Sequence, residues 1–373
     1  MRSLIGMLGL ALASAQSPDA FPSRLSGLAP SPTTPMVVFL AGFPDDTHSF
    51  DAVAPAFEGT HTVLKLALPG YEGAPISAKW GLPFTTLVEK MHDAVEAQAH
   101  GDLHLVVHDW GAYLGLLYSE KYLTEVVKLA LLDIGHQTMA DAAEMTLMEK
   151  VVGATYQLFL AWCFVVDAIG LRPLAALAQM LFPWQTIGPC PHEFALPAKV
   201  EEWFSAPDFK ICYPYYVLWK QILTGTAWMP AMPSMPTLFV WGTRKRMRFH
   251  TSRFTKDLDA RDDGSRSVAL DCGHFMQAQL PAEVAFQLLS FFAPETVGPC
   301  AAYASSVKLE DCNEFGVGPD VQGDLSAMRS CHRCVSDRID ADCAPGTDCE
   351  AFRLREEEDF KAFLEKEARE AEL

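Results

Sequence analysis

Short apolar runs recur along the middle of the chain, and each ends in small or turn-forming residues. They lie at 36–40, 61–68, 104–107, 127–132, 236–241 and 267–270. Runs of this length with turn residues at their ends are typical of buried strands. Segments with helical spacing lie between or after them, at 85–99, 110–122, 251–258 and 282–292. Strands that alternate with helices predict an α/β fold with a mostly parallel sheet and helices on both faces.

The alternation stops after the strand at 127–132. Residues 137–235 are helical in pattern, rich in aromatic residues and interrupted by Pro. An insertion of this size between two strands predicts a helical cap, so we expect a core built from 36–136 and 236–298. One helical stretch, around Phe159, approaches the ~18 apolar residues that span a bilayer, and a compact cap could bury it.

Composition indicates a globular protein and argues against one class of partner. Half of the 373 residues are hydrophobic and 20% are charged, which is typical of globular proteins. The net charge of −18 repels phosphate backbones, so we do not expect a nucleic-acid partner.

The C-terminal segment, 299–373, differs from the rest. It carries 18 acidic and nine basic residues, which is half of the net charge. It also holds six of the ten cysteines, namely Cys300, Cys312, Cys331, Cys334, Cys343 and Cys349. Six cysteines in a secreted chain predict three disulfides with 15 possible pairings. The alternative is a zinc site, because Cys331 and Cys334 have the spacing of two zinc ligands. We expect a Cys-rich appendage here.

The N-terminus has the layout of a secretory signal peptide. Met1-Arg2 is positive, 4–15 is apolar or small, and Ala13-Ser14-Ala15 is a small-x-small cleavage site. We therefore expect a signal peptide at 1–15, no stable membrane anchor after its removal, and a secreted or secretory-pathway protein; an uncleaved anchor is the alternative. Residues 16–35 are predicted to be a disordered lead-in, or the second half of a bipartite organelle-targeting sequence.

The strongest candidate chemistry follows the strand at 104–107. His108-Asp109-Trp110-Gly111 lies between this strand and a helix, which is the setting of a nucleophile elbow. The central side chain of such a turn lies at the carboxyl edge of the sheet, near a helix N-terminus that favours negative charge. Asp tolerates the left-handed backbone that the turn needs. Asp109 is therefore the candidate nucleophile, and a helix cap is the alternative role.

Together, several stretches resemble the α/β-hydrolase superfamily, specifically its epoxide-hydrolase-like branch. They are LAGFPDDTHSFD (40–51), LPGYEGAP (68–75), HLVVHDWGAYLG (104–115), LALLDIG (129–135), PTLFVWGT (236–243) and DCGHFMQAQLPAEV (271–284). The resemblance covers roughly 36–293 and implies an α/β-hydrolase fold with the cap inserted after the sixth strand of the family. It implies no metal and no cofactor.

The resemblance also implies roles for individual residues. An Asp is ionised at neutral pH and can attack carbon to form an ester, here at Asp109. His274 would activate the water that hydrolyses this ester. The backbone N–H groups of Phe43 and Trp110 would form the oxyanion hole. Two cap tyrosines would protonate the epoxide oxygen. The expected pair is Tyr156 and Tyr216, and Tyr215 or Tyr213 is the alternative to Tyr216.

The sequence departs from the family pattern at three places. Ala41 replaces a His before the oxyanion residue, and Val107 replaces a small residue near the nucleophile. At the usual position of the acid that orients the histidine stands Lys245, within the basic run Arg244-Lys245-Arg246. Asp133 ends the strand at 127–132, where dehalogenase relatives keep this acid, so it is either the triad acid or an ordinary strand-end residue. The basic run is either a solvated loop or a site for an anionic group.

Three functions remain open at this point. The first is an epoxide-hydrolase-like enzyme for a small apolar substrate. The second is a haloalkane dehalogenase, which would share Asp109, Trp110, His274 and Asp133. It needs a second halide-binding Trp or Asn: the one Asn, Asn313, lies in the C-terminal segment, and Trp80 or a Trp of the cap is the alternative. The third is a catalytically silent binding protein on the same fold, because Ala41 and Lys245 break the pattern.

Overall fold

The computed structural model describes residues 18–136, 144–184 and 196–293. The chain divides into two compact units, residues 1–281 and 282–373. The second unit contributes one described helix, α10 (Pro281–Phe292), close to the helix predicted at 282–292. The proposed signal peptide and the Cys-rich appendage lie outside the described residues, so the choice between disulfides and zinc stays a prediction.

The predicted, mostly parallel sheet is confirmed. Its strands are β1 (Ser23–Gly27), β2 (Met36–Leu40), β3 (Thr62–Leu66), β4 (Leu103–His108), β5 (Val126–Leu132), β6 (Thr237–Gly242) and β7 (Arg266–Leu270). Within the described part of the chain their order is β1-β3-β2-β4-β5-β6-β7, and only the β1–β3 pair is antiparallel. β2 and β4 are buried along their whole length, as apolar strands covered on both faces must be.

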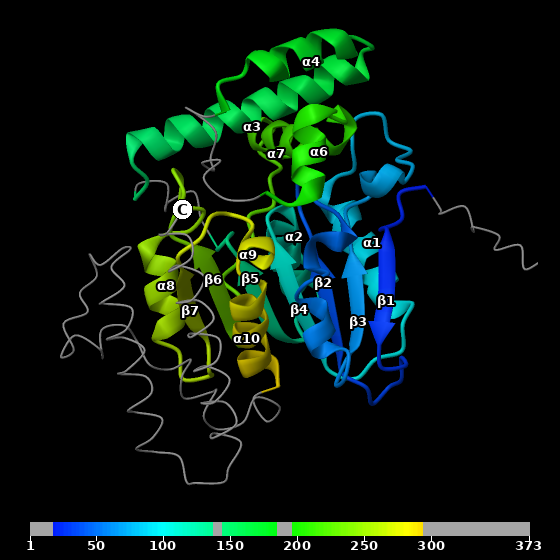
Figure 1. Cartoon of the computed structure of the whole chain (residues 1–373), viewed down its shortest axis with the longest axis vertical. Helices are drawn as coiled ribbons and strands as arrows, with labels where there is room; N and C mark the ends of the chain where they lie inside the picture. The colour runs from blue at the N-terminus through cyan, green and yellow to red at the C-terminus, as the bar shows by residue number, and fades with distance from the viewer. Residues whose placement is uncertain (1–17, 137–143, 185–195, 294–373) are drawn as a thin grey trace, which may run out of the picture. The chain divides into compact units, whose positions relative to one another are not determined.

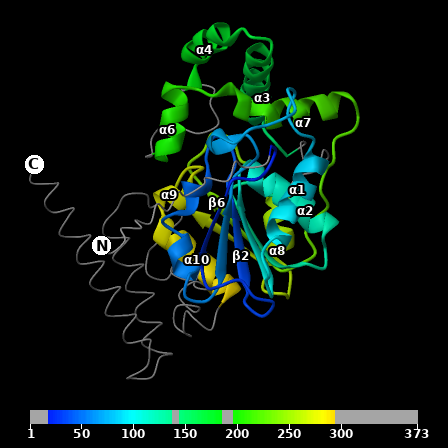
Figure 2. The ribbon, with the colours of Figure 1, turned by 90° about the vertical axis from the view of Figure 1, so that its right-hand side faces the viewer.

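Helices and helical turns cover the two faces of this sheet. The helices α1 (Phe84–Glu96), α2 (Trp110–Lys121) and α8 (Ser252–Asp259) lie on one side, as Figure 2 shows. On the other side, Phe39 of β2 packs against Phe50 and Phe57, with ring centroids 5.0 and 5.7 Å apart. These two rings come from the short turns η1 (Thr47–Phe50) and η2 (Ala54–Phe57).

The predicted disorder of the lead-in, 16–35, is wrong where the structure describes it. Ser23–Gly27 forms β1 and pairs along its length with β3, from Ser23 opposite Leu66 to Gly27 opposite Thr62. This edge pairing uses backbone groups and needs little apolar side-chain surface; Leu25 is 47% exposed. A polar sequence can therefore form a strand that its composition does not reveal.

The cap is inserted between β5 and β6 and lies over the carboxyl ends of the parallel strands (Figure 1). Its described helices are α3 (Leu147–Ala168), α4 (Arg172–Leu181), α6 (Ala198–Ser205) and α7 (Tyr213–Leu223), with the turn η5 (Phe209–Cys212) before α7. Among the described residues of 137–235, no strand interrupts these helices, as the sequence predicts.

Only the inner side of α3 is buried by the rest of the protein. Tyr156 and Leu160 lie on its buried side, whereas Val151, Leu158 and Trp162 are 40–47% exposed. By length and composition α3 is apolar enough to cross a membrane, and 44% of its most apolar segment is buried. The cap therefore buries the stretch around Phe159 in part, leaving an apolar outer surface.

The register of the parallel strands brings four loops to one edge of the sheet. Leu40 lies opposite Val107, His108 opposite Leu132, and Leu132 opposite Val240. The chain segments that follow β2, β4, β5 and β6 therefore begin side by side. In open parallel sheets this carboxyl edge is where ligands bind.

Candidate active site

Asp109 is the single residue between β4 and α2, and its backbone is strained. Its φ of 54° and ψ of −124° lie outside the regions that most residues adopt, which costs about 1–3 kcal/mol and requires support from the surroundings. Two glycines provide that support. A Cβ at Gly42 would lie 2.4 Å from Asp109 Oδ1, and a Cβ at Gly111 would lie 2.3 Å from the carbonyl oxygen of Leu40. The elbow predicted from the sequence is therefore formed, and it is closely packed.

The structure accommodates the departures at Val107 and Ala41. The side chain of Val107 packs where a Cβ of Gly115 would lie, so a glycine in α2 makes room for it. The turn after Ala41 is braced by Asp45, whose backbone N–H donates to the carbonyl of Gly42 and whose carboxylate accepts from the hydroxyl of Ser49 at 2.5 Å. The turn thus keeps its shape without the histidine of the family.

The two carboxylate oxygens of Asp109 have different partners. Oδ1 accepts a hydrogen bond of 2.6 Å from the backbone N–H of Phe43, and the backbone of Trp110 also bonds the carboxylate. Oδ2 lies 3.5 Å from Nε2 of His274. Burial raises the pKa of Asp109, but the hydrogen bond and charge of His274 outweigh burial and keep the pKa below its ordinary value. The carboxylate is therefore ionised and 15% exposed.

His274 follows β7 and lies between two carboxylates. Its Nδ1 is 2.5 Å from Oδ2 of Asp133, which leaves Nε2 facing Asp109. Its carbonyl oxygen accepts a bond of 2.9 Å from His108 Nε2. Burial lowers the pKa of His274, but the charge of Asp133 and the hydrogen bond to Asp109 outweigh it and raise the pKa to about 9. In the resting protein the imidazole is thus protonated at neutral pH.

Asp133 is the carboxylate that contacts His274. It follows β5 in a left-handed conformation, with a φ of 68°, and its side chain is completely buried. Its Oδ1 accepts from the backbone N–H of Gly242 at 3.2 Å and from Nζ of Lys245. Burial raises the pKa of Asp133, yet Lys245 and His274 hold it well below its usual range.

Neither sequence-based interpretation of the basic run, a solvated loop or an anion site, describes Lys245. Its side chain is 1% exposed, and its ammonium group pairs with Asp133. Arg244 forms two short bonds of 2.5 and 2.6 Å with Asp271, on the partly exposed side of the loop. The run therefore places one cation inside the protein and one outside, and neither lines a described cavity.

A second layer of polar side chains, which the sequence did not suggest, supports this group. Gln277 donates to Ser49 at 2.9 Å and bonds His108 Nδ1 at 3.2 Å. Burial and the charge of His274 lower the pKa of His108 to about 4, so it is neutral and orients the backbone of His274. The one signal that could have indicated this layer is the position of Gln277 in the sequence, three residues after His274; in the structure it lies in the short helix α9 (Met276–Gln279).

Two cavities meet at Asp109. The first extends under α3 and α6, and the second extends along α2 and α7. Four residues line both, namely Asp109, Tyr156, Tyr215 and Phe249. The rest of the first cavity is mainly aromatic or aliphatic, including Trp184, Trp203, Phe204 and Leu160. Asp109 and His274 are the only charged residues among the described residues that line either cavity.

Of the candidate tyrosines, the structure brings Tyr156 and Tyr215 to the cavities and not Tyr216. The rings of Tyr156 and Tyr215 lie 6.1 Å apart, and Tyr215 is also 4.9 Å from the ring of Trp110. Tyr216 packs instead against Trp80 and Phe164. Expecting Tyr216 in the site was therefore wrong, and Tyr215, the open alternative, takes its place.

Helical periodicity explains this correction. In α7, Leu218 and Ile222 also line the second cavity, three and seven residues after Tyr215. These positions share one face of a helix, while Tyr216 lies about 100° around it. Tyr213, the third alternative, is fully buried against the position of Gly81 and lines neither cavity.

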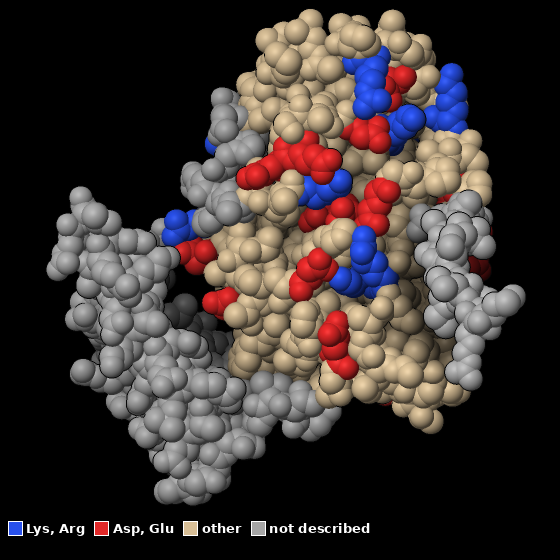
Figure 3. Space-filling view, turned by 45° about the vertical axis from the view of Figure 1, so that its right-hand side comes forward, with Lys and Arg blue, Asp and Glu red and all other residues tan. Residues whose placement is uncertain are grey.

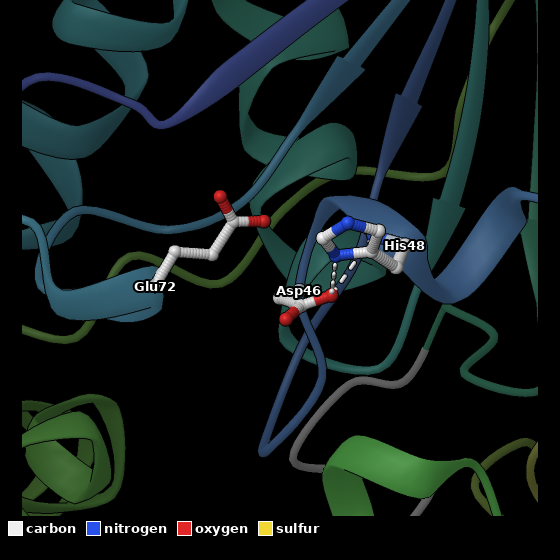
Figure 4. A group of neighbouring side chains, drawn as sticks. All are labelled: Asp46, His48 and Glu72. Atoms are coloured by element: carbon white, nitrogen blue, oxygen red, sulfur yellow. Dashed lines mark hydrogen bonds and ion pairs between the residues drawn. The ribbon is translucent and has the colours of Figure 1, made fainter. Parts of the chain in front are cut away.

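Asp46, His48 and Glu72 form a small cluster near the turn after β2 (Figure 4). Their oxygen and nitrogen atoms lie within 4.8 Å of one another. Asp46 accepts from the backbone N–H of His48 at 2.8 Å, and Glu72 accepts from the backbone N–H of Thr47 at 2.8 Å. These bonds cap η1 and tie it to the next loop, so protein donors already use the carboxylates.

Most of the chain matches a known protein family: the family model described as alpha/beta hydrolase family covers residues 37–287. A curated relative, a fluoroacetate dehalogenase from Burkholderia sp, is 26% identical over 167 residues, which are 41% of this chain and 52% of the relative. The chain thus spans about half the length of that relative.

Solved structures resemble the fold at low sequence identity. An epoxide hydrolase from Bacillus megaterium in complex with an inhibitor is 18% identical, with a TM-score of 0.52 over 73% of this chain and 96% of its own. A protein from Salmonella enterica provisionally named an acyltransferase is also 18% identical, with a TM-score of 0.54 over 74% and 91% of the two chains. Because proteins with different names match equally, these likenesses establish the fold alone.

Proposed function

Given that this chain belongs to the alpha/beta hydrolase family, we propose that it is an epoxide-hydrolase-like enzyme that acts through an ester on Asp109. One observation carries the proposal: a carboxylate occupies the elbow, with the backbone N–H of Phe43 on one oxygen and His274 facing the other. An ionised Asp attacks carbon without a base, whereas ordinary esterases and proteases need a hydroxyl or thiol at this position.

The first step opens the epoxide. Because Oδ1 of Asp109 is held by the N–H of Phe43, Oδ2 is the oxygen available for attack. Oδ2 forms a bond to one epoxide carbon as the bond from that carbon to the ring oxygen breaks. The departing oxygen takes a proton from the hydroxyl of Tyr156 or Tyr215, which line the cavities beside Asp109. The product of this step is a hydroxyalkyl ester.

The second step releases the diol. Once Asp109 is an ester its negative charge is lost, so only one of the two carboxylates that raise the pKa of His274 remains charged. His274 loses its proton, which neutralises the tyrosinate left by the first step. The neutral Nε2 of His274 then takes a proton from water while the water oxygen bonds to the ester carbonyl carbon. The N–H groups of Phe43 and Trp110 stabilise the resulting oxyanion. Its collapse breaks the bond from the carbonyl carbon to the alkoxide, which takes the proton that His274 received from water. The carboxylic acid of Asp109 then gives its proton to His274, which restores the carboxylate and the imidazolium.

The cavities favour a neutral, apolar substrate with groups on both sides of the epoxide. Asp109 lies where two apolar compartments meet, so a substrate can extend into each. No Lys or Arg is among the described residues that line them, and charged side chains of both signs are interspersed on the surface that Figure 3 shows. The substrate named for the Burkholderia relative, fluoroacetate, is a small anion, which such a cavity would disfavour.

One observation favours dehalogenation as a second candidate. Trp110 lines the second cavity, and its indole N–H is buried without a hydrogen-bond partner among the described residues. An orphan donor there can bind a halide. However, Trp184 and Trp203 line the other cavity and donate to the carbonyls of Gln179 and Asp208. Trp80 lines neither cavity, and the one Asn, Asn313, lies outside the described residues.

Product analysis separates these functions. Purified protein is incubated with styrene oxide, trans-stilbene oxide, a 1-chloroalkane and fluoroacetate. We expect diol from the epoxides, with a higher kcat/KM for stilbene oxide because it fills both compartments. Halide release without diol would replace the proposal by the dehalogenase. No turnover and no ester on the Asp109 peptide would favour a binding protein.

A further inference from the structure

Lys245 occupies an unusual place for a cation. Its side chain is 1% exposed, and its ammonium group contacts Oδ1 of Asp133, the carboxylate whose other oxygen bonds His274. Nζ also lies 5.2 Å from the ring centroid of Phe249, a residue of both cavities. Burying an ammonium group costs free energy unless a counter-ion offsets the cost, and here Asp133 is that counter-ion. Packing alone gives no reason for a charged side chain at this position.

The charges around His274 can be counted from every side. The elbow brings Asp109 and the neutral His108, the end of β5 brings Asp133, and the loop after β6 brings Lys245. The pKa of His250, near Lys245, is lowered to about 4 by burial and by this cation, so His250 is neutral. In the resting protein the imidazolium thus lies between the carboxylates of Asp109 and Asp133, and the ammonium of Lys245 pairs with Asp133. Asp45, whose pKa burial raises to about 6, is a further buried carboxyl beside Asp109.

The charges around His274 change when Asp109 becomes an ester. One negative charge is lost, so the imidazolium loses one of the two carboxylates that stabilise it. With Lys245 present, Asp133 keeps its own counter-ion, and His274 can lose its proton. Without Lys245, the imidazolium would be the only cation in contact with the buried carboxylate of Asp133 among the described residues and would hold its proton. A protonated imidazole cannot accept a proton from water.

We propose that Lys245 is a positioning residue for ester hydrolysis: it neutralises Asp133 and thereby allows His274 to act as a base once Asp109 is esterified. The inference rests on the proposed ester mechanism, but the contacts on which it depends do not. It also gives a physical reason why a lysine is compatible with the position where related enzymes carry an acid. Here the acid that contacts His274 is Asp133, which directly follows β5, and Lys245 is its counter-ion.

The test compares Lys245→Gln and Lys245→Met with the matched control Arg244→Met, which removes the neighbouring cation of the same loop. Gln keeps a neutral donor toward Asp133 and serves if the Met variant does not fold. Single-turnover reactions measure ester formation and ester hydrolysis separately. For both Lys245 variants we expect hydrolysis at about pH 7 to fall tenfold or more, with its acid limb shifted up by about one unit. Ester formation should change less than about threefold, and Arg244→Met should leave the acid limb in place.

An equal loss of both steps at every pH, or an unshifted acid limb, would overturn the proposal, since a purely structural lysine predicts either. A measurement without turnover separates this failure from that of the proposed function. NMR titration of His274 in the resting protein should show a higher pKa in Lys245→Gln than in the wild type, even if no epoxide is hydrolysed. An unchanged His274 pKa would rule out the role of Lys245 whatever the substrate.

Discussion

The cavity has two unlike walls. The sheet-edge wall is formed by the turns after β2, β4, β5 and β7. It carries Asp109, Asp133 and His274, and each of these residues makes at least two polar contacts. The cap wall, formed by α3, α6 and α7, meets it mainly through aromatic rings, such as Tyr215 against Phe43 at 5.2 Å. The comparison indicates that the sheet edge holds the proposed nucleophile and base, whereas the cap supplies most of the apolar surface and the two candidate proton donors, Tyr156 and Tyr215.

The largest effect is expected on the sheet-edge wall at Asp109. Asp109→Asn removes the nucleophilic charge and should lower kcat by about 10⁴-fold or more, because no other carboxylate lines these two cavities in the described part of the chain. The matched control is Asp271→Asn, which removes an exposed carboxylate bonded to Arg244. Steady-state diol formation measures both. An Asp109→Asn variant with more than about a tenth of wild-type activity would remove Asp109 from the mechanism.

His274→Gln should divide the reaction into its two halves. Ester formation should persist, since it needs no base, while hydrolysis should fall by about 10²–10⁴-fold, the usual contribution of a general base. The ester should then accumulate and be visible as a mass increase of the intact protein. A variant that loses both halves equally would show that His274 does not act as the hydrolytic base.

The two neighbouring tyrosines of α7 give a sharper test of the cap wall. Tyr215→Phe should lower ester formation by about 10–100-fold, since one proton donor to the epoxide oxygen is lost. Tyr216→Phe should change it less than about twofold, because this ring packs against Trp80 and Phe164. Rapid-quench measurements of ester formation compare the two. The reverse order would place Tyr216 in the site and contradict the arrangement of α7.

The pH dependence should differ between the two half-reactions. In the resting protein His274 has a pKa of about 9, raised by two carboxylates, one of which loses its charge in the ester. The pKa of His274 should therefore be lower in the ester, and hydrolysis should lose about tenfold per pH unit only below that lower value. Ester formation should be nearly constant from about pH 6 to 8, because Asp109 stays ionised there. A hydrolysis limb at or above pH 9 would mean that esterification does not release the imidazole.

The smallest effect is expected in the second compartment. Leu218→Trp would narrow it behind Tyr215 without touching a charged group. The ratio of kcat/KM for stilbene oxide to that for styrene oxide should fall several-fold, since one hydrophobic contact is worth about 1–3 kcal/mol. Leu160→Trp is the matched change in the first cavity. An unchanged ratio for both variants would show that substrates do not reach into both compartments.

The two walls were also unequally predictable from the sequence. The parallel sheet and the turn at Asp109 follow from the local pattern of strands, turns and helices. His274 follows from the resemblance of 271–284 to the family. The choice of Tyr216 was wrong because α7 carries several tyrosines close together. Only the face of α7 that lines the second cavity distinguishes Tyr215 from Tyr216. The strand β1 was missed because edge pairing leaves little apolar pattern.

The partner of Lys245 is a different kind of omission. The sequence shows a lysine where the family carries an acid and a candidate acid at the end of β5, but the two are 112 residues apart. Their pairing depends on the register of β5 with β6, which brings the ends of both strands together. The local sequence pattern cannot predict this contact, because it depends on how two distant strands pair in the sheet.

The central claim is that Asp109 forms and releases an ester. A single turnover in water enriched in ¹⁸O, with protein in excess over trans-stilbene oxide, tests it directly. Attack of water on the ester carbonyl leaves ¹⁸O in Asp109, so mass spectrometry should find the label in the peptide that contains this residue and not in the diol. Label in the diol alone would mean that water attacks the epoxide directly, and the account would be wrong.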